Sequence, residues 1–339
     1  MRASGRAHPG GAHPGPAMEG VVLESIGGVY RVLLGSDDPG EERGERPGEV
    51  PGEEPGEEPG AGRMVDAFLR GRLKQERRTG DRVVAGDRVR VGQGEDGTWT
   101  VEEVFQRRSE LVRAGPGGHR PKVVAANLDR VVVVVSADHP PLRREQVDRF
   151  LALAETCGLE GVLVVNKADL AGDAGALAEV VELYRGIGYT VLPTSVMTGE
   201  GLEPFGRILH QGINALVGPS GVGKSSLLNA LAPGLSLRVG EVTARLKSGR
   251  HTTVGARLLL LPGGGKVVDT PGFSDVGLWG VDPAALPEAF REFQSLAEAC
   301  RFRGCSHVHE PQCAVQAAVE EGKIDRGRYQ SYLDLQAGD

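Results

Sequence analysis

The sequence has few cysteines, few aromatic residues and no long apolar run. Only 4 of its 339 residues are cysteine, which disfavours a disulfide-bonded scaffold and favours a reducing compartment. Aromatic residues make up 4% of the chain. No run reaches the roughly 18 apolar residues that a transmembrane helix needs. The N-terminus lacks the apolar segment of a secretory signal, so we expect a cytoplasmic protein that does not associate with a membrane.

The excess of negative over positive charge lies in one segment. The net charge is −7, and residues 37–63 alone hold ten acidic residues and three arginines, also a net of −7. The rest of the chain is formally neutral, so an acidic total does not argue against a nucleic-acid partner. Repeated Pro-Gly-Glu triplets cannot bury a core, which predicts a disordered acidic insertion at 37–63. The Gly- and Pro-rich tail 1–17 is expected to be disordered as well.

Short strand patterns fill the region from 18 to 113. They occur on both sides of a Gly27-Gly28 turn, near Met64, and at 70–74, 86–91 and 98–104. Several short strands with glycine turns and no helix predict a small barrel. Between 70 and 90 there are eight basic and three acidic residues. An oligonucleotide-binding (OB) barrel with a basic face is a common RNA-binding module, although surface arginines can also serve only to solvate a barrel.

After a linker at 114–122, strand and helix patterns alternate, which predicts a doubly wound α/β domain. The expected strands are 129–136, 161–165, 190–193, 213–217 and 265–269, and the expected helices are 144–157, 176–186 and 202–211. From about 282 the pattern becomes helical, with candidates at 287–298, 314–321 and 326–336.

A phosphate-binding loop follows the apolar run 213–217. Residues 218–225 read Gly-x4-Gly-Lys-Ser, the P-loop pattern, between a predicted strand and a predicted helix. The glycines allow successive N–H groups to converge on phosphate oxygens. Lys224 is expected to reach the β- and γ-phosphates, and the Ser225 hydroxyl is expected to ligate Mg²⁺.

A second motif indicates the base. Asn166-Lys-Ala-Asp169 follows a buried strand, and the Asp169 carboxylate can accept both the N1–H and N2–H donors of guanine. Alone, the tetrapeptide could be a helix cap, but beside a P-loop it favours GTP over ATP. Ser195, after the next strand, is placed to support the base or to cap the following helix.

Two further segments are expected around the γ-phosphate. Asp269-Thr-Pro-Gly272 ends a strand, so Asp269 can hold the Mg²⁺ shell and the Gly272 N–H can meet the γ-phosphate. Residues 249–253 read Gly-Arg-His-Thr-Thr, and either Thr252 or Thr253 is the expected second Mg²⁺ ligand. Phe273 stands where many GTPases have a water-orienting glutamine, and His251 is the candidate catalytic residue in its place, the alternative being that His251 only contacts RNA or solvent.

The motif order is permuted, because the base motif at 166–169 precedes the P-loop at 218–225. The simplest explanation is a circular permutation of an ordinary GTPase sheet. The complete predicted nucleotide set is Asn166, Lys167, Asp169, Ser195, Gly218, Pro219, Ser220, Gly221, Val222, Gly223, Lys224, Ser225, Ser226, Asp269 and Gly272.

The late cysteines predict a structural zinc site. Cys300, Cys305, His307 and Cys313 supply three thiolates and one imidazole, a closed set for tetrahedral zinc. His309 is the alternative imidazole ligand. Cys157 lies on a predicted helix face and is expected to be ordinary core.

Together these residues resemble the RsgA (YjeQ) family of ribosome-dependent GTPases over nearly all of 18–335. The resemblance implies an OB-type barrel, a circularly permuted P-loop GTPase domain and a C-terminal helical zinc-binding domain, here at 18–113, 123–281 and 282–339. It also implies a role in late maturation of the small ribosomal subunit, with 16S-type ribosomal RNA and GTP or GDP as partners, and we expect a monomer. The acidic insertion and Ser195-Val196, where the family has Ser-Ala, depart from the family pattern.

Three alternative functions share some of these motifs: a P-loop ATPase or small-molecule kinase, an RNA-binding module with a non-hydrolysing nucleotide site, and a zinc-dependent hydrolase. The first needs adenine specificity, and the second is disfavoured by intact Lys224, Ser225 and Asp269. The closed zinc ligand set disfavours the third.

The acidic insertion yields the first prediction. Deletion of residues 37–63 should leave the melting temperature and GTP turnover unchanged, because the Pro-Gly-Glu repeats bury no apolar surface. Thermal unfolding and a phosphate-release assay of the shortened chain test this. A large drop in melting temperature would show that the segment is structural.

Overall fold

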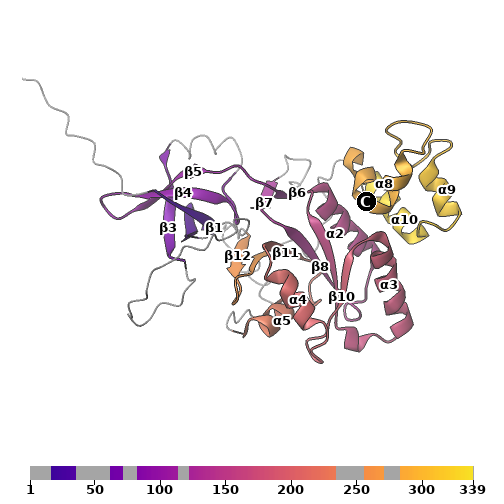
Figure 1. Ribbon diagram of the computed structural model, residues 1–339, viewed down its shortest axis with the longest axis horizontal. Helices are drawn as coiled ribbons and strands as arrows, with labels where there is room; N and C mark the ends of the chain where they lie inside the picture. The colour runs from indigo at the N-terminus through magenta and orange to yellow at the C-terminus, as the bar shows by residue number, and fades with distance from the viewer. Residues whose placement is uncertain are drawn as a thin grey trace, which may run out of the picture.

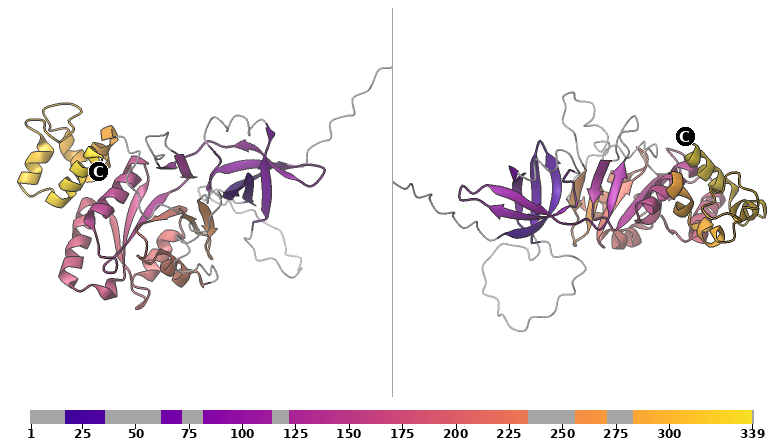
Figure 2. Two further views of the ribbon diagram at one scale, coloured as in Figure 1. Left: turned by 180° about the vertical axis from the view of Figure 1, so that it is seen from behind. Right: turned by 90° about the horizontal axis from the view of Figure 1, so that it is seen from above.

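The computed structural model describes residues 17–35, 62–71, 82–113, 122–233, 256–270 and 283–338. The barrel, a sheet covered by helices, and a group of C-terminal helices lie in a row (Figures 1 and 2). Within the described ranges, no helix is long and apolar enough to cross a membrane. Most of the tail 1–17, most of the insertion 37–63 and the segment 114–121 lie outside these ranges.

The N-terminal barrel is closed by five strands, as expected. They are β1 (Met18–Ile26), β2 (Val29–Leu34), β3 (Met64–Leu69), β4 (Arg88–Gln93) and β5 (Trp99–Val104), in the order β1-β2-β3-β5-β4. Alternate apolar residues such as Val22, Val32 and Val89 are fully buried inside, which is the period-2 pattern of a strand with one buried face. The strand expected at 70–74 is wrong in its described part, because β3 ends at Leu69, the last residue of its alternating pattern.

A small two-stranded sheet connects the barrel to the rest of the chain. Strands β6 (Glu110–Arg113) and β7 (Lys122–Ala126) pair antiparallel, and Ala85 bridges to Ala125. The fully buried Asp87 accepts two hydrogen bonds from Arg107, at 2.7 and 3.0 Å. The segment 114–121 therefore joins two paired strands.

The central sheet has six strands in the order β10-β9-β8-β11-β13-β12. Their bounds are β8 (Arg130–Ser136), β9 (Glu160–Asn166), β10 (Thr190–Pro193), β11 (Ile213–Val217), β12 (Arg257–Leu260) and β13 (Lys266–Asp269). All neighbours are parallel except β12, which runs antiparallel to β13.

The chain winds outward twice from the middle of this sheet. It passes through β8, β9 and β10 to one edge, returns to β11 beside β8, and continues to β12 and β13 at the other edge. Strand order reverses between β8 and β11, which is where open α/β sheets bind ligands.

Helices cover both faces of the sheet (Figure 1). Helices α2 (Arg144–Thr156) and α3 (Ala174–Ile187) pack with Val131, Val133 and Val135 of β8 in one apolar core. On the other face, α4 (Leu202–Leu209) and α5 (Lys224–Leu231) pack with Val132 and Val134. Because successive side chains of a strand point to opposite faces, one continuous valine run serves both cores.

The C-terminal part consists of short helices around an aromatic core. They are α7 (Leu286–Ala289), α8 (Arg291–Ala297), α9 (Ala314–Glu320) and α10 (Arg326–Ala337). The single helix expected at 287–298 is wrong, because Phe290 adopts extended angles (φ −102°, ψ 98°) and separates α7 from α8. Its fully buried ring packs edge-on against Tyr332, with centroids 5.1 Å apart.

A buried ionic cluster fastens these helices to α2. Arg328 of α10 and Asp148 of α2 are 1% and 0% exposed and lie 2.8 Å apart. Arg328 also binds both oxygens of Glu292, at 2.8 and 3.2 Å. Burial raises the pKa of Asp148, and the positive charge of Arg328 opposes that rise. Each charge of this buried ion pair therefore needs the other for compensation.

The buried ionic cluster should be needed for the stability of the protein. Arg328→Met should lower the free energy of unfolding by about 3 kcal/mol, because it leaves the Asp148 carboxyl buried without its cation. Chemical denaturation followed by circular dichroism measures the loss. Arg326→Met, an exposed change on the same helix, is the matched control, and equal stability of the two variants would contradict the interpretation.

Candidate functional site

The candidate nucleotide site lies at the carboxyl ends of the parallel strands. The P-loop follows β11, the base motif begins at Asn166, the last residue of β9, Ser195 follows β10, and Asp269 ends β13. Because β8 and β11 flank the point where strand order reverses, the sheet brings these four segments to one edge.

The P-loop glycines are required by geometry. Gly218, Gly221 and Gly223 have φ of 135°, 81° and 98°, a region that favours glycine. A Cβ at Gly218 would lie 2.0 Å from the Val134 carbonyl oxygen, which belongs to the neighbouring strand β8. This loop conformation therefore favours glycine at all three positions.

Lys224, the first residue of α5, folds over its own loop. Its ammonium donates to the carbonyl oxygens of Gly218, at 2.6 Å, and Pro219, at 2.8 Å. These bonds hold the positive charge inside the curve of the loop, beside the helix N-terminus. The arrangement suits a polyanion, because the helix end and the ammonium both attract negative charge.

Asn166 and Lys167 tie the base motif to the P-loop. The Asn166 amide donates to the Val222 carbonyl at 2.8 Å and accepts from the Thr194 hydroxyl at 3.2 Å. The Lys167 ammonium donates to the Gly221 carbonyl at 2.8 Å and to the carbonyl of His139. The structure thus joins motifs that are far apart in the sequence.

Asp169 and Ser195 play different parts at this edge. Asp169 lies exposed in a short 3-10 helix, Ala168–Leu170, whose Ala168 N–H donates to the Thr194 carbonyl at 3.0 Å. Ser195 is fully buried, and its hydroxyl accepts from the Thr198 N–H at 3.1 Å. Helix α4 has Gly201 as its N-cap, so Ser195 supports its own turn and does not cap that helix.

Asp269 and Ser225 supply oxygen atoms near Lys224. Asp269 lies opposite Leu216 of β11, and Ser225 is buried in the first turn of α5. Burial raises the pKa of Asp269, while the charges of Lys224 and Arg257 oppose that rise. His251, Thr252, Thr253 and Gly272 lie outside the described residues.

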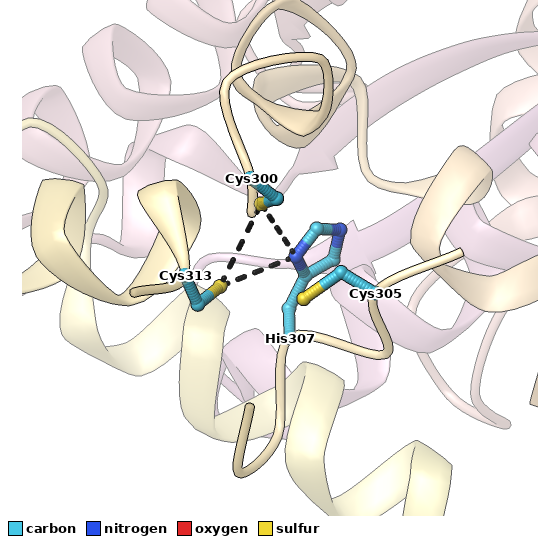
Figure 3. A group of neighbouring side chains, drawn as sticks. All are labelled: Cys300, Cys305, His307 and Cys313. Atoms are coloured by element: carbon cyan, nitrogen blue, oxygen red, sulfur yellow. Dashed lines mark hydrogen bonds between the residues drawn. The ribbon is translucent and has the colours of Figure 1, made fainter. Parts of the chain in front are cut away.

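A second cluster gathers Cys300, Cys305, His307 and Cys313, whose ligand atoms all lie within 4.8 Å of one another (Figure 3). The His307 Nδ1 is 3.3 Å from the Cys313 sulfur and 3.6 Å from the Cys300 sulfur, and the two sulfurs are 3.9 Å apart. His309 is exposed and outside the group. Cys157 is half-buried against the core of α2 and α3.

Hydrogen bonds fix the backbone of this cluster. The Tyr329 hydroxyl donates to the His307 carbonyl at 2.7 Å, and Tyr332 donates to the Ser306 carbonyl. Burial lowers the pKa of His307 and raises the pKa of Cys305 to about 12. A neutral imidazole is a metal ligand, and a bound cation would favour the thiolate that burial opposes.

Comparison with known proteins agrees with this geometry. The RsgA GTPase family model matches residues 104–279. The chain belongs to this family. The small ribosomal subunit biogenesis GTPase RsgA of Gemmatimonas aurantiaca is 45% identical over 277 residues, 81% of this chain and 90% of the relative. The RsgA protein of Thermotoga maritima is 42% identical over 256 residues, 75% and 83% of the two chains.

Solved structures of the family share the fold. YjeQ from Thermotoga maritima superimposes with a TM-score of 0.72 at 32% identity, over 95% of this chain and 98% of that one. YloQ, a circularly permuted GTPase, gives 0.69 at 26%, over 98% and 97%. The predicted family and permuted GTPase fold are therefore confirmed, and this member of the RsgA family is a GTP hydrolase.

Sequence reasoning missed Arg257 and the strand that carries it. Residues 257–260 form β12, and Arg257 lies directly opposite Asp269 in the β12–β13 ladder. The apolar run 258–261 was a local signal for this strand. No local signal shows that the Arg257 Nε lies 3.4 Å from a carboxylate oxygen of Glu24 on β1, because the two residues are distant in the sequence.

Base recognition gives the next prediction. Asp169→Asn should weaken GTP binding by about 10- to 100-fold, through loss of charge-assisted hydrogen bonds to guanine, and should admit xanthosine triphosphate. Competition with a fluorescent guanine nucleotide measures both effects. Asp173→Asn is the control, because Asp173 caps α3 and asparagine caps equally well. An Asp169 variant that keeps the wild-type preference would refute the assignment.

Proposed function

We propose that this GTPase binds the small ribosomal subunit, acts in its late maturation and hydrolyses GTP faster when bound to it. The strongest support is that the chain has the permuted nucleotide site and that its relatives are named small ribosomal subunit biogenesis GTPase. The proposed ligand on the barrel side is 16S-type ribosomal RNA. The protein is proposed to act as a cytoplasmic monomer.

The residues of the site take specific roles in this proposal. Asp169 accepts from the guanine edge, and the Lys167 stem, held by Gly221 and His139, covers the base. On GTP binding, Lys224 exchanges its loop carbonyls for the β- and γ-phosphates. Positioning and charge stabilisation supply most of the catalysis in phosphoryl transfer.

Magnesium fits the oxygen atoms at this edge. The buried Ser225 lies at the start of α5, and Asp269 ends β13, which pairs with the strand β11 that leads into the P-loop. Mg²⁺ prefers such oxygen donors together with nucleotide phosphates. Thr252 or Thr253 is proposed as the further ligand. The ion would neutralise phosphate charge during hydrolysis.

Zinc fits the cysteine cluster. A tetrahedral ion with Zn–S bonds of about 2.3 Å requires sulfur atoms roughly 3.8 Å apart, and the Cys300 and Cys313 sulfurs lie 3.9 Å apart. Four protein ligands leave no open position, so the proposed role is structural. Tyr329 and Tyr332 of α10 would hold the loop that carries His307 against the domain core.

One zinc ion per chain is therefore predicted. Elemental analysis should give a zinc-to-protein ratio of about 1, and Cys305→Ser should lose the metal and melt at a lower temperature. Cys157→Ser, outside the cluster, should keep the metal. Purified protein without zinc, or a Cys305 variant with full metal content, would contradict the site.

Stimulation by the small subunit is the test of the proposed function. Free protein should hydrolyse GTP slowly, because Phe273 cannot orient water, and isolated small subunits should accelerate turnover. His251→Ala should keep GTP and subunit binding but lower stimulated turnover by about 100-fold, the size of a lost acid–base or water-orienting group. His210→Ala, before β11 at the opposite edge of the sheet, should behave as wild type.

These experiments distinguish the proposed function, the role of His251 and the ATPase or kinase alternative. Turnover that does not respond to small subunits would refute the proposed function, whereas stimulated turnover that survives His251→Ala would refute only the role of His251. Displacement of GTP by ATP at equal concentration would favour the ATPase or kinase alternative.

A further inference from the structure

A row of alternating charges runs from the barrel to the nucleotide site, one residue on each of five strands. Its members are Asp66 on β3, Arg31 on β2, Glu24 on β1, Arg257 on β12 and Asp269 on β13. Arg31 lies opposite both Asp66 and Glu24 in the barrel ladders, and Arg257 lies opposite Asp269 in the sheet. Directly opposed residues share one face of a sheet, so their side chains can interact.

Three ion pairs join the first four members of this row. Arg31 lies 3.2 Å from Asp66 and 2.7 Å from Glu24. Arg257 reaches across to the barrel, where its Nε lies 3.4 Å from a Glu24 oxygen. The contact forms where β1 packs against β12, with Val21, Leu23, Ala256 and Leu258 in one shared apolar core.

Two carboxylates, those of Glu24 and Asp269, are thus candidates to bind Arg257. Glu24, which is 13% exposed, holds it, and no ion pair within 4.0 Å joins Arg257 to Asp269 in the described part of the chain. Arg257 nevertheless lies directly opposite Asp269 in the β12–β13 ladder, and its positive charge opposes the rise in the pKa of Asp269 that burial causes.

A guanidinium bound to Asp269 would obstruct magnesium. Arginine binds carboxylates through both oxygens, and Mg²⁺ needs one of those oxygens and an uncompensated negative charge. Any carboxylate that holds Arg257 elsewhere therefore favours metal binding at Asp269. In this fold that carboxylate comes from a different domain.

We propose that Glu24 of the barrel is a positioning residue for the magnesium site, because it holds Arg257 away from Asp269. This inference rests on the proposed role of Asp269 in magnesium binding. It gives the barrel a direct electrostatic influence on the nucleotide site. The small ribosomal subunit plays no part in it.

The test is the magnesium dependence of nucleotide binding in the full chain. A fluorescent, non-hydrolysable GTP analogue is titrated at increasing Mg²⁺, and the Mg²⁺ concentration for half-maximal binding is compared. Glu24→Gln should raise that concentration on the order of threefold, since Arg257 is about half exposed and the pair is partly screened. Circular dichroism checks that the variant is folded.

Two further variants isolate the cause. Asp66→Asn removes one negative charge from the same row without touching Arg257, and it should leave the magnesium dependence as in wild type. Adding Arg257→Gln to Glu24→Gln should abolish the shift, because no guanidinium remains to compete for Asp269.

Three results would overturn the inference. They are an unchanged magnesium requirement in Glu24→Gln, an equal shift in Asp66→Asn, and a shift that persists in the double variant. Asp269→Ala identifies the source of a failure: if it also leaves the magnesium dependence unchanged, the assignment of Asp269 fails and the inference with it. If Asp269→Ala removes the dependence and Glu24→Gln does not alter it, the inference alone fails.

Discussion

The buried amide of Asn166 lies where three loops of the nucleotide site meet. It donates to the Val222 carbonyl in the P-loop and accepts from Thr194 at the end of β10. Gly223 approaches so closely that a Cβ there would lie 2.4 Å from this amide nitrogen. In a chain whose motifs occur in permuted order, this contact fixes the phosphate loop relative to the base motif. The roles proposed for Lys224 and Asp169 depend on a fixed distance between the phosphate loop and the base motif.

The permuted chain order also determines where each flanking domain attaches to the nucleotide-binding domain. The β12–β13 hairpin connects the segment that contains His251 and Thr252 to Asp269, and its outer strand packs against β1 of the barrel. Helix α2, which packs on β8 and β9, binds the C-terminal helices through Asp148 and Arg328. Each flanking domain is therefore attached to a different part of the nucleotide-binding domain, and the barrel contacts the strand that pairs with Asp269.

The elements predicted well from sequence are those with local signals. The P-loop glycines, the valine run of β8 and the cysteine spacing each encode their structure within a few residues. Contacts between distant residues could not be predicted in this way. The bond between Glu24 and Arg257 and the pair of Asp148 with Arg328 appear only after folding. The break at Phe290 was missed because its cause is the packing of that ring against Tyr332.

A crystal structure with a GTP analogue and Mg²⁺ would show whether the permuted motifs form one guanine nucleotide site. We expect the guanine edge on Asp169, Mg²⁺ beside Ser225 and Asp269, and the Lys224 ammonium on the phosphates in place of the Gly218 and Pro219 carbonyls. A nucleotide bound elsewhere, or a Lys224 that stays on those carbonyls with the analogue bound, would contradict this expectation.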